Sequence, residues 1–314
     1  MMEKTPAASP PVRAAPLAKR VRRELRVRAL LVLLPLLSRL PHRLAVAFGA
    51  ACGWLAWFAV PRHRRAAMEH LAIAFPERDA SWRARVGRAS FANLGRSAME
   101  VLIADRVDLA RAVQLEPGSM EVVSAALAEG RGAVAFSCHL GNWELLARRM
   151  ALEGVPLATI AREARDPRLT ALLERSRSLS GVKSLWRGDP GAVRAMIQHV
   201  RGGGIVAALI DQDTEVAGYF LPFFGREAFT PRAPADLALR TGAAALFART
   251  RRVAPTLHRI TISRAPIPGG EDADVASREL SAWATREIEA EVRRTPDQWV
   301  WMHARWRTRP SSMR

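Results

Sequence analysis

Cysteine and tyrosine are scarce in this 314-residue chain, which contains two cysteines, Cys52 and Cys138, and one tyrosine, Tyr219. Two cysteines are too few for the disulfide framework of a small secreted protein or for a cysteine-held zinc cluster. One tyrosine, within 6% aromatic residues in total, does not fit a protein that stacks single-stranded RNA bases on its surface. These shortages exclude disulfide-rich domains, zinc-cluster domains and aromatic RNA-binding surfaces.

Acidic residues are also in deficit, because 30 Asp and Glu stand against 48 Lys and Arg and give a net charge of +18. Such an excess favours a partner with negative charge, namely a nucleic acid, an anionic membrane surface or an acidic carrier protein. Hydrophobic residues make up 49% of the chain, which excludes disorder over most of its length. The length suggests one large domain or two ordinary ones.

The amino-terminal region divides into a polar tail and two apolar runs. Residues 1–24 are expected to form a flexible basic tail, which leads into the basic cluster KRVRRELRVR at 19–28. The apolar runs follow at residues 29–40 and 44–60, and the second has about 17 residues without a charge, at the short limit for a membrane-spanning helix. We therefore predict that residues 25–61 form hydrophobic helices that associate with a membrane.

Three arrangements fit these helices, and the sequence leaves them open. A single span would use Gly49 and Gly53, whose spacing lets another helix approach closely. A hairpin or an interfacial pair of helices agrees better with basic residues at both ends, because positive charge favours the cytoplasmic side. The third arrangement is a buried helix of a soluble domain. A cleaved secretory signal is disfavoured by the long preceding tail.

The remaining residues, 62–314, alternate between helical and strand patterns without an internal repeat. Helical spacing of apolar residues predicts helices at 81–104, 143–152, 169–179, 192–200, 233–240 and 273–294. Short apolar runs predict strands at 132–138, 156–161, 205–210, 243–248 and 256–262. Buried strands with intervening helices indicate a single α/β domain with a mixed or parallel central sheet covered by helices.

A polar cluster follows the first of these predicted strands. His139 occupies the turn, Asn142 is a good N-cap, and Glu144 falls in the first turn of the next helix. Active sites of open α/β sheets lie at such carboxyl ends of strands. Glu144 is expected to fix the tautomer of His139, so that the other ring nitrogen removes a proton from a hydroxyl. The spacing alone also fits a hydrogen-bonded surface pair.

Two other chemistries at this cluster are disfavoured. Neighbouring residues at a strand end point to opposite faces, so Cys138 is expected to be a small core residue and not a nucleophile. The evidence for a metal site is weak, because no second His or carboxylate lies at a ligand spacing such as that of H-E-x-x-H.

Further motifs follow in a fixed order along the chain. They are LAIAFPE at 71–77, Glu100, His139-x4-Glu144, Arg162, Arg187, IDQD at 210–213, PFFG at 222–225, and PDQWVWMH at 296–303 with Arg305 and Trp306. From about residue 29 to 310, this series resembles the H-x4-D/E acyltransferases, and specifically the lipid A biosynthesis (lauroyl and myristoyl) acyltransferases. The chain departs from the family pattern at His70, where Asn is usual, and at Ile210, where Pro is common.

The resemblance implies an O-acyltransferase that moves a fatty acyl chain from an acyl thioester, with acyl carrier protein as the favoured donor, to a hydroxyl of a lipid A-type glycolipid precursor. It makes His139 the general base and Glu144 its orienting partner. Direct attack on the thioester needs no metal, no cofactor and no covalent intermediate. The implied location is the cytoplasmic face of the bacterial inner membrane.

The resemblance also implies four substrate-binding residues. Arg162 and Arg187 are expected to bind phosphate of the glycolipid or the donor, although each also fits an ordinary surface arginine. Asp211 and Asp213 are expected to orient an arginine or the acceptor hydroxyl, although loop capping fits them nearly as well.

Two other functions compete with this one. The first keeps the chemistry and changes the acceptor to another glycolipid or to a lysophospholipid, with acyl-CoA as donor. The second is a non-catalytic basic protein that binds a membrane or a nucleic acid. The ordered motifs count against the second, and we expect no nucleic-acid partner.

The tryptophans near the carboxyl terminus, Trp299, Trp301 and Trp306, fit two locations. They suit a membrane interface beside basic residues, and they suit core packing against the last helix. We predict packing, with the neighbouring Arg305, Arg307 and Arg309 outside.

Overall fold

The computed structural model describes residues 17–164, 166–266, 268–269 and 272–310. Residues 1–16 of the predicted basic tail lie outside this range. Residues 17–24 belong to the first helix, which begins at Leu17.

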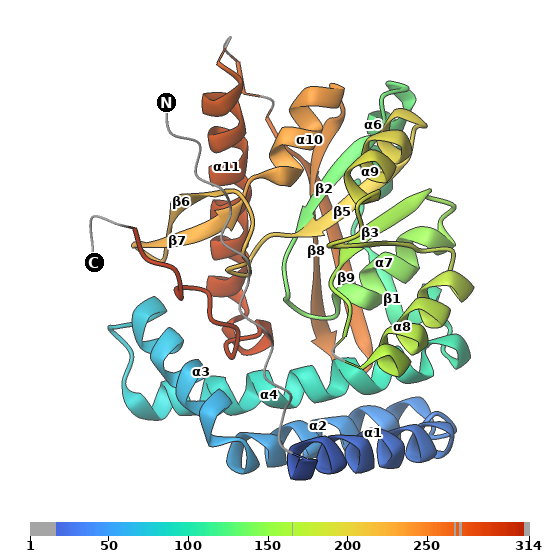
Figure 1. The fold of residues 1–314 in the computed structure, drawn as a ribbon, viewed down its shortest axis with the longest axis vertical. Helices are drawn as coiled ribbons and strands as arrows, with labels where there is room; N and C mark the ends of the chain where they lie inside the picture. Colours follow the sequence, from blue (N-terminus) through green and yellow to red (C-terminus); the bar gives the residue numbers. More distant parts are fainter. Residues whose placement is uncertain (1–16, 165, 267, 270–271, 311–314) are drawn as a thin grey trace.

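Helices and strands alternate through most of the chain (Figure 1). The helices are α1 (Leu17–Leu37), α2 (His42–Ala59), α3 (Pro61–Ala74), α4 (Ala80–Ile103), α5 (Leu109–Ala112), α6 (Ser119–Ala128), α7 (Trp143–Leu152), α8 (Pro167–Leu179), α9 (Ala192–Arg201), α10 (Ala233–Thr241) and α11 (Ala273–Arg294), with 3-10 turns η1 (Ala104–Arg106) and η2 (Pro296–Gln298). The strands are β1 (Val113–Leu115), β2 (Ala133–Ser137), β3 (Leu157–Ala161), β4 (Lys183–Trp186), β5 (Ile205–Leu209), β6 (Gly218–Phe223), β7 (Arg226–Pro231), β8 (Ala244–Ala254) and β9 (Leu257–Arg264).

A seven-stranded sheet, in the order β1-β9-β8-β2-β5-β3-β4, forms the centre of the molecule. Its strands pair in parallel except that β9 runs antiparallel to β8. A separate antiparallel hairpin is made by β6 and β7. The predicted α/β class with a mixed, largely parallel sheet is therefore confirmed.

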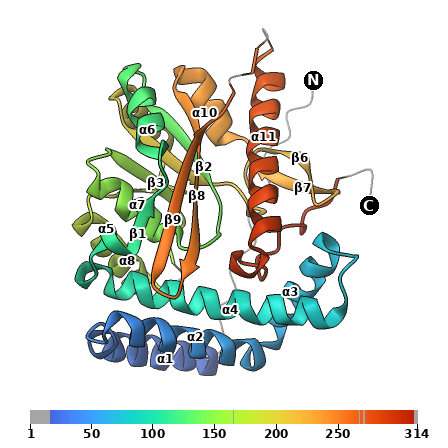
Figure 2. The ribbon, with the colours of Figure 1, turned by 180° about the vertical axis from the view of Figure 1, so that it is seen from behind.

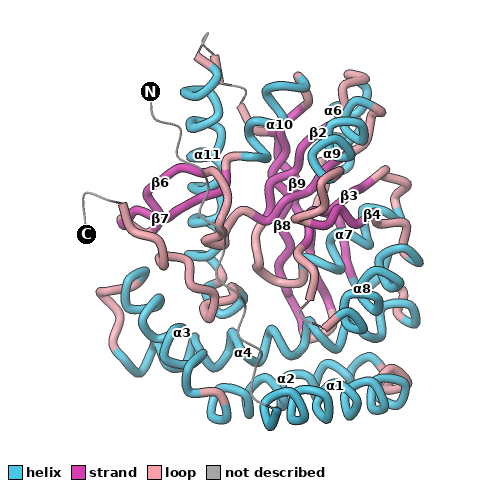
Figure 3. Tube along the Cα trace, in the orientation of Figure 1, coloured by secondary structure: helices cyan, strands magenta, loops and turns pink. Residues whose placement is uncertain are grey.

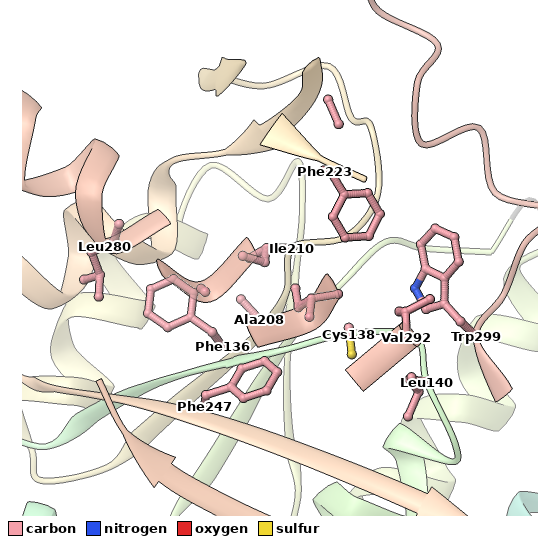
Figure 4. Packing of buried hydrophobic residues seen from close by; sticks show 14 of the residues in the cluster. Phe136, Cys138, Leu140, Ala208, Ile210, Phe223, Phe247, Leu280, Val292 and Trp299 are labelled. Atoms are coloured by element: carbon pink, nitrogen blue, oxygen red, sulfur yellow. The ribbon is translucent and has the colours of Figure 1, made fainter. Parts of the chain in front are cut away.

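Both faces of the sheet are buried, as the side chains of β2 show. Val134 and Phe136 belong to a core shared with α9, α10 and α11, whereas Ala133 and Ala135 belong to a second core shared with α6 and α7. Successive side chains of a strand point to opposite faces, so this alternation places helices on both sides (Figures 1 and 2). Cys138 is also buried, among apolar side chains that include Leu140 and Trp299, as predicted (Figure 4).

The amino-terminal helices stack against α4 (Figures 1 and 2). A Cβ atom on Gly49 would collide with the backbone of Gly95, and one on Gly53 would collide with the backbone of Phe91. The close helix approach expected from the Gly49–Gly53 spacing is therefore real, and its partner is α4 of the same chain.

The length and apolar composition of the amino-terminal helices bear on whether they can cross a membrane. Among the described residues, no single helix has both the length and the apolar composition needed to cross a membrane. The pair α2 and α3 meets the criterion jointly, but the two helices are bent by 91°.

The carboxyl-terminal segment packs back onto the domain as a loop after α11 (Figure 3). Trp299, Trp301 and Trp306 are buried, so the prediction of core packing is confirmed. Arg307 and Arg309 are exposed as expected, but for Arg305 the prediction is wrong, because that residue is only 1% exposed. Its guanidinium donates to the Phe229 carbonyl and to the Thr230 hydroxyl of β7, which gives a buried cation the acceptors that burial demands.

Candidate active site

A histidine and an aspartate meet at the carboxyl ends of two neighbouring parallel strands. β2 and β5 pair in a register that sets Ser137 opposite Leu209, so His139 and Asp211 both lie two residues further along. The Nδ1 of His139 is 2.7 Å from Oδ1 of Asp211, and the backbone N–H of His139 donates to Oδ2 at 2.8 Å. The sheet itself therefore creates this pair, which we call the His139–Asp211 dyad.

Asp211 is held as a carboxylate although it is only 1% exposed. Burial on its own would raise its pKa, but the charge interaction with His139 and hydrogen bonds from His139 and Trp299 lower the pKa to about 2. A carboxylate fixed at Nδ1 makes that nitrogen the protonated one, and it stabilises a positive charge on the ring. The opposite nitrogen, Nε2, then carries the lone pair.

Glu144 is not the carboxylate that contacts His139, and this corrects our expectation. Both of its oxygens are bound by Arg177 of α8, with Nε donating to Oε2 at 3.0 Å and the second guanidinium nitrogen donating to Oε1 at 2.5 Å. The physical reason is burial, because Arg177 is only 7% exposed and its cation needs a counter-charge. His139 and Glu144 nevertheless line the same cavity.

That cavity has a volume of about 470 Å³ and lies between the sheet and helices α8 and α9. Its wall is largely apolar, with Ile160, Leu173, Leu185, Trp186, Val193 and Met196 among the residues that form it. His139, Glu144 and Gln212 supply polar groups to the same space. A largely apolar space with a histidine in its wall suits an apolar ligand whose reactive end lies at the histidine.

The two predicted phosphate-binding arginines also line this cavity. Arg162 follows β3 and Arg187 follows β4, so the parallel pairing of these strands brings them to one edge. Burial and the positive charge of Arg162 lower the pKa of Arg187. An anion placed between the two guanidinium groups would relieve this repulsion.

The two predicted aspartates have different surroundings. Asp211 belongs to the dyad, and no arginine among the described residues makes a hydrogen bond or ion pair with its side chain. Asp213 accepts hydrogen bonds from the backbone N–H and the hydroxyl of Thr308, at 2.6 and 2.9 Å. Asp213 therefore caps the loop, and it also pairs with an arginine, because a guanidinium nitrogen of Arg307 lies 3.5 Å from its Oδ1. These contacts tie the carboxyl-terminal segment to the loop after β5.

Helix α4 supports the turn that carries His139 from behind. Ser97 donates to the Gly141 carbonyl at 3.0 Å, and Asn142 donates to Oε2 of Glu100 at 2.9 Å. The side-chain oxygen of Asn142 accepts the Leu145 N–H at 3.2 Å, as expected for an N-cap. The turn is thus fixed to α4 as well as to α7.

Glu100 is itself buried, at 1% exposure. Burial would raise the pKa of Glu100, but hydrogen bonds and charge interactions with His258 and Arg252 lower it to about 2. This buried charged cluster connects α4, β8 and β9 behind the site.

Two further polar side chains reach His139 and were not assigned a role from the sequence. The amide nitrogen of Gln212 is 3.1 Å from Nε2 of His139 and 2.7 Å from Nδ1 of His303. His303 belongs to the terminal motif, and its ring centroid lies 5.0 Å from that of His139. Their positions in the IDQD and PDQWVWMH motifs were the signal that both lie near the site.

Comparison with known proteins identifies the family of this chain. Residues 18–308 match the family described as bacterial lipid A biosynthesis acyltransferases. The chain belongs to this family. Among its curated relatives are two enzymes of Escherichia coli K12, each 25% identical. The lipid A biosynthesis palmitoleoyltransferase aligns over 276 residues (87% of this chain, 88% of the relative) and the lauroyltransferase over 286 residues (88% and 90%).

A third relative is a phosphatidylinositol mannoside acyltransferase of Mycobacterium tuberculosis CDC 1551. It is 29% identical over 140 residues, which cover 44% of each chain. The acyltransferase described here is thus an enzyme of the lipid A and glycolipid type, and the sequence-based family assignment is confirmed.

Proposed function

We propose that this acyltransferase moves a fatty acyl chain from an acyl thioester, with acyl carrier protein as the donor, to a hydroxyl of a lipid A-type glycolipid precursor. The observation that carries the proposal is the His139–Asp211 dyad in the wall of a largely apolar cavity. The cavity suits the acyl chain, and the dyad suits removal of a proton from an alcohol.

The reaction follows from the protonation state of the dyad. Nε2 of His139 takes the proton of the acceptor hydroxyl while the hydroxyl oxygen attacks the thioester carbonyl carbon. The tetrahedral intermediate then collapses, the carbon–sulfur bond breaks, and the imidazolium returns its proton to the departing sulfur. Asp211 stabilises the imidazolium between the two proton transfers.

Arg162 and Arg187 are proposed to bind a phosphate group of the acceptor or the donor. Both line the cavity that contains His139, so a phosphate bound there lies on the substrate that reaches the dyad. Charge-assisted bonds from two guanidinium groups orient an anion as well as attract it.

Residues 25–61 are proposed to attach the enzyme to the cytoplasmic face of the bacterial inner membrane. Helix α2 packs on α4 through Ala45, Gly49, Gly53 and Trp57, all of which are buried. Its other side exposes Leu44, Phe48, Trp54, Leu55 and Phe58, and α1 exposes Val32, Leu33 and Leu36. Exposed apolar side chains on two adjacent helices suit insertion into the membrane interface.

A different glycolipid acceptor is the second candidate, because one relative is named for phosphatidylinositol mannoside. The dyad and the cavity serve either acceptor. The acceptor is decided by mass spectrometry of total lipids from a deletion strain, complemented with wild type or with His139→Ala. We expect one acyl chain to be missing from lipid A, restored by wild type and not by the variant. Loss of an acyl chain from a mannoside lipid would select the second acceptor, and unchanged lipids would reject the proposal.

Membrane attachment is tested by deletion of residues 1–61. We expect full-length protein in the membrane fraction, and we expect the shortened protein to leave that fraction unless loss of α2 unfolds it. Because α2 packs on α4, the matched test keeps the helix and replaces Phe48, Leu55 and Phe58 by Ser. Release of this folded triple variant supports attachment by the exposed face, and full retention contradicts it.

A further inference from the structure

We propose that the side-chain amide of Gln212 donates a hydrogen bond to the oxyanion of the acyl-transfer intermediate, and that His303 orients this amide. The inference rests on the proposed function and assigns a second catalytic group to the same site. Attack on a thioester moves negative charge onto the carbonyl oxygen, and a donor aimed at that oxygen lowers the barrier.

The position of Gln212 is set by its neighbour in the sequence. It directly follows Asp211 at the carboxyl end of β5, and it lines the same cavity as His139. Its amide nitrogen lies 3.1 Å from Nε2 of His139, the nitrogen that takes the proton. A donor within hydrogen-bond distance of the base is also near the carbonyl group that the activated hydroxyl attacks.

An amide nitrogen carries two hydrogens, and the rings of two histidines lie within hydrogen-bond distance of it. Nδ1 of His303 is 2.7 Å away, and we assign one hydrogen to it. Nε2 of His139 is 3.1 Å away, and we assign the other hydrogen to it when no substrate is bound. A substrate hydroxyl that takes this place at Nε2 releases the second hydrogen, which then meets the developing oxyanion while the first stays on His303.

His303 is suited to hold the amide because it stays neutral. Burial and the nearby charge of His139 lower the pKa of His303 to about 4, so at neutral pH one of its ring nitrogens is a hydrogen-bond acceptor. We assign that role to Nδ1, the nitrogen nearer to the Gln212 amide. A protonated ring would donate from both nitrogens and would turn the carbonyl oxygen of Gln212 toward itself. That orientation would remove the N–H from the reaction site.

His303 is itself fixed by the carboxyl-terminal segment. Its backbone N–H donates to the Val300 carbonyl at 3.2 Å, and the Val300 N–H donates to the His139 carbonyl at 3.2 Å. The two rings meet edge to face, at an angle of 89°. The segment that contains His303 is therefore hydrogen-bonded to His139, the proposed base.

The experiment compares Gln212→Met with the wild type, because Met keeps the length of the side chain and lacks both N–H groups. Palmitoyl-acyl carrier protein and palmitoyl-CoA are both supplied as donors, and release of the free thiol is measured with water and with purified lipid A precursor as acceptors. We expect kcat to fall about 100- to 1000-fold, the size of effect found when one oxyanion donor is removed, with KM for the donor changed less than threefold. A kcat within threefold of wild type in a folded Gln212→Met protein overturns the proposal.

The role of His303 is tested by a conservative pair. His303→Asn places an amide oxygen close to the position of Nδ1 and keeps an acceptor for Gln212, whereas His303→Leu keeps bulk and removes the acceptor. We expect kcat of the Asn variant within fivefold of wild type and kcat of the Leu variant at least 20-fold lower. Equal kcat values in the two folded variants would show that His303 does not orient the amide.

These outcomes are distinct from failure of the proposed function. Normal turnover in His139→Ala would reject the dyad as the site of acyl transfer. Active wild type, inactive His139→Ala and fully active Gln212→Met would reject only the oxyanion role. Thermal unfolding of every variant, together with binding of a non-hydrolysable thioether analogue of palmitoyl-CoA, separates misfolding from loss of chemistry.

Discussion

The indole Nε1 of Trp299 donates a hydrogen bond of 2.8 Å to Oδ2 of Asp211, the same oxygen that accepts the backbone N–H of His139. A residue near the carboxyl terminus thereby fixes the carboxylate of the dyad. The backbone bonds from Gly141 to Gln298 and from Val300 to His139, at 3.1 and 3.2 Å, join the same two segments. The terminal motif is therefore hydrogen-bonded to both residues of the His139–Asp211 dyad.

Asp211→Asn should lower kcat about 1000- to 10,000-fold without unfolding the protein. Asparagine keeps the shape, but it cannot stabilise the imidazolium, and its NH2 group favours the wrong tautomer of His139. The matched control is Asp213→Asn, the same change two residues on, at a side chain that binds Thr308. Steady-state turnover of acyl thioester measures both, and equal loss in the two variants would contradict the dyad.

Glu144→Gln should lower the free energy of unfolding by about 3 kcal/mol, because it leaves the buried cation of Arg177 without its counter-charge. The double variant Glu144→Gln with Arg177→Met should lose less than the sum of the two single changes. Denaturant unfolding measures all three. Unchanged stability together with a collapse of kcat would return Glu144 to the role of partner for His139.

Gly95→Ala should cost about 1–3 kcal/mol of stability, because the added Cβ meets the backbone of Gly49 across the contact between α2 and α4. Gly269→Ala is the control, since a Cβ there meets nothing within 4 Å. Differential scanning fluorimetry compares the two. A Gly95→Ala protein as stable as the control would mean that α2 does not pack tightly on α4 in solution.

Arg162→Ala and Arg187→Ala should each raise KM for a phosphorylated acceptor about tenfold, as expected for loss of a hydrogen bond between charged groups. Neither change should affect an acceptor that lacks phosphate. Arg194→Ala, an exposed arginine of α9, serves as the control. Unchanged kinetics in both variants would leave the two residues as ordinary cavity-wall arginines.

Stability should fall as the pH is lowered from about 6.5 to 4, in part through His303. The pKa of this group is 6.5 in its ordinary state and about 4 in the folded protein, where burial disfavours the charged ring. Between these values the unfolded chain binds more protons than the folded one, so the free energy of unfolding rises with pH. His303→Asn should flatten this part of the profile, measured by urea unfolding at a series of pH values. An unchanged slope would show that His303 does not titrate in this way.

Many local features of this protein follow from residues that are close together along the chain. Continuous apolar runs predicted β2, β3, β5 and β8, because a strand that is buried on both faces has few polar positions. The turn with His139, the N-cap Asn142 and the burial of Cys138 follow from neighbours a few residues apart. The short edge strands β1 and β4 and the β6–β7 hairpin were not predicted. Strands β1, β4 and β7 are short and of mixed polarity, so they give no clear period, and β6 contains Gly218 and Pro222, which are uncommon within strands.

Which side chains meet at the site depends on how distant parts of the chain pack together. Glu144 is five residues from His139, yet the carboxylate that reaches the ring belongs to Asp211, 72 residues away, because β2 and β5 lie side by side in register. Likewise, the spacing of Gly49 and Gly53 predicted a close contact with another helix, but the fold was needed to identify that helix as α4. Local sequence fixes the direction of a side chain within its own element, whereas the pairing of strands and helices fixes what that side chain touches.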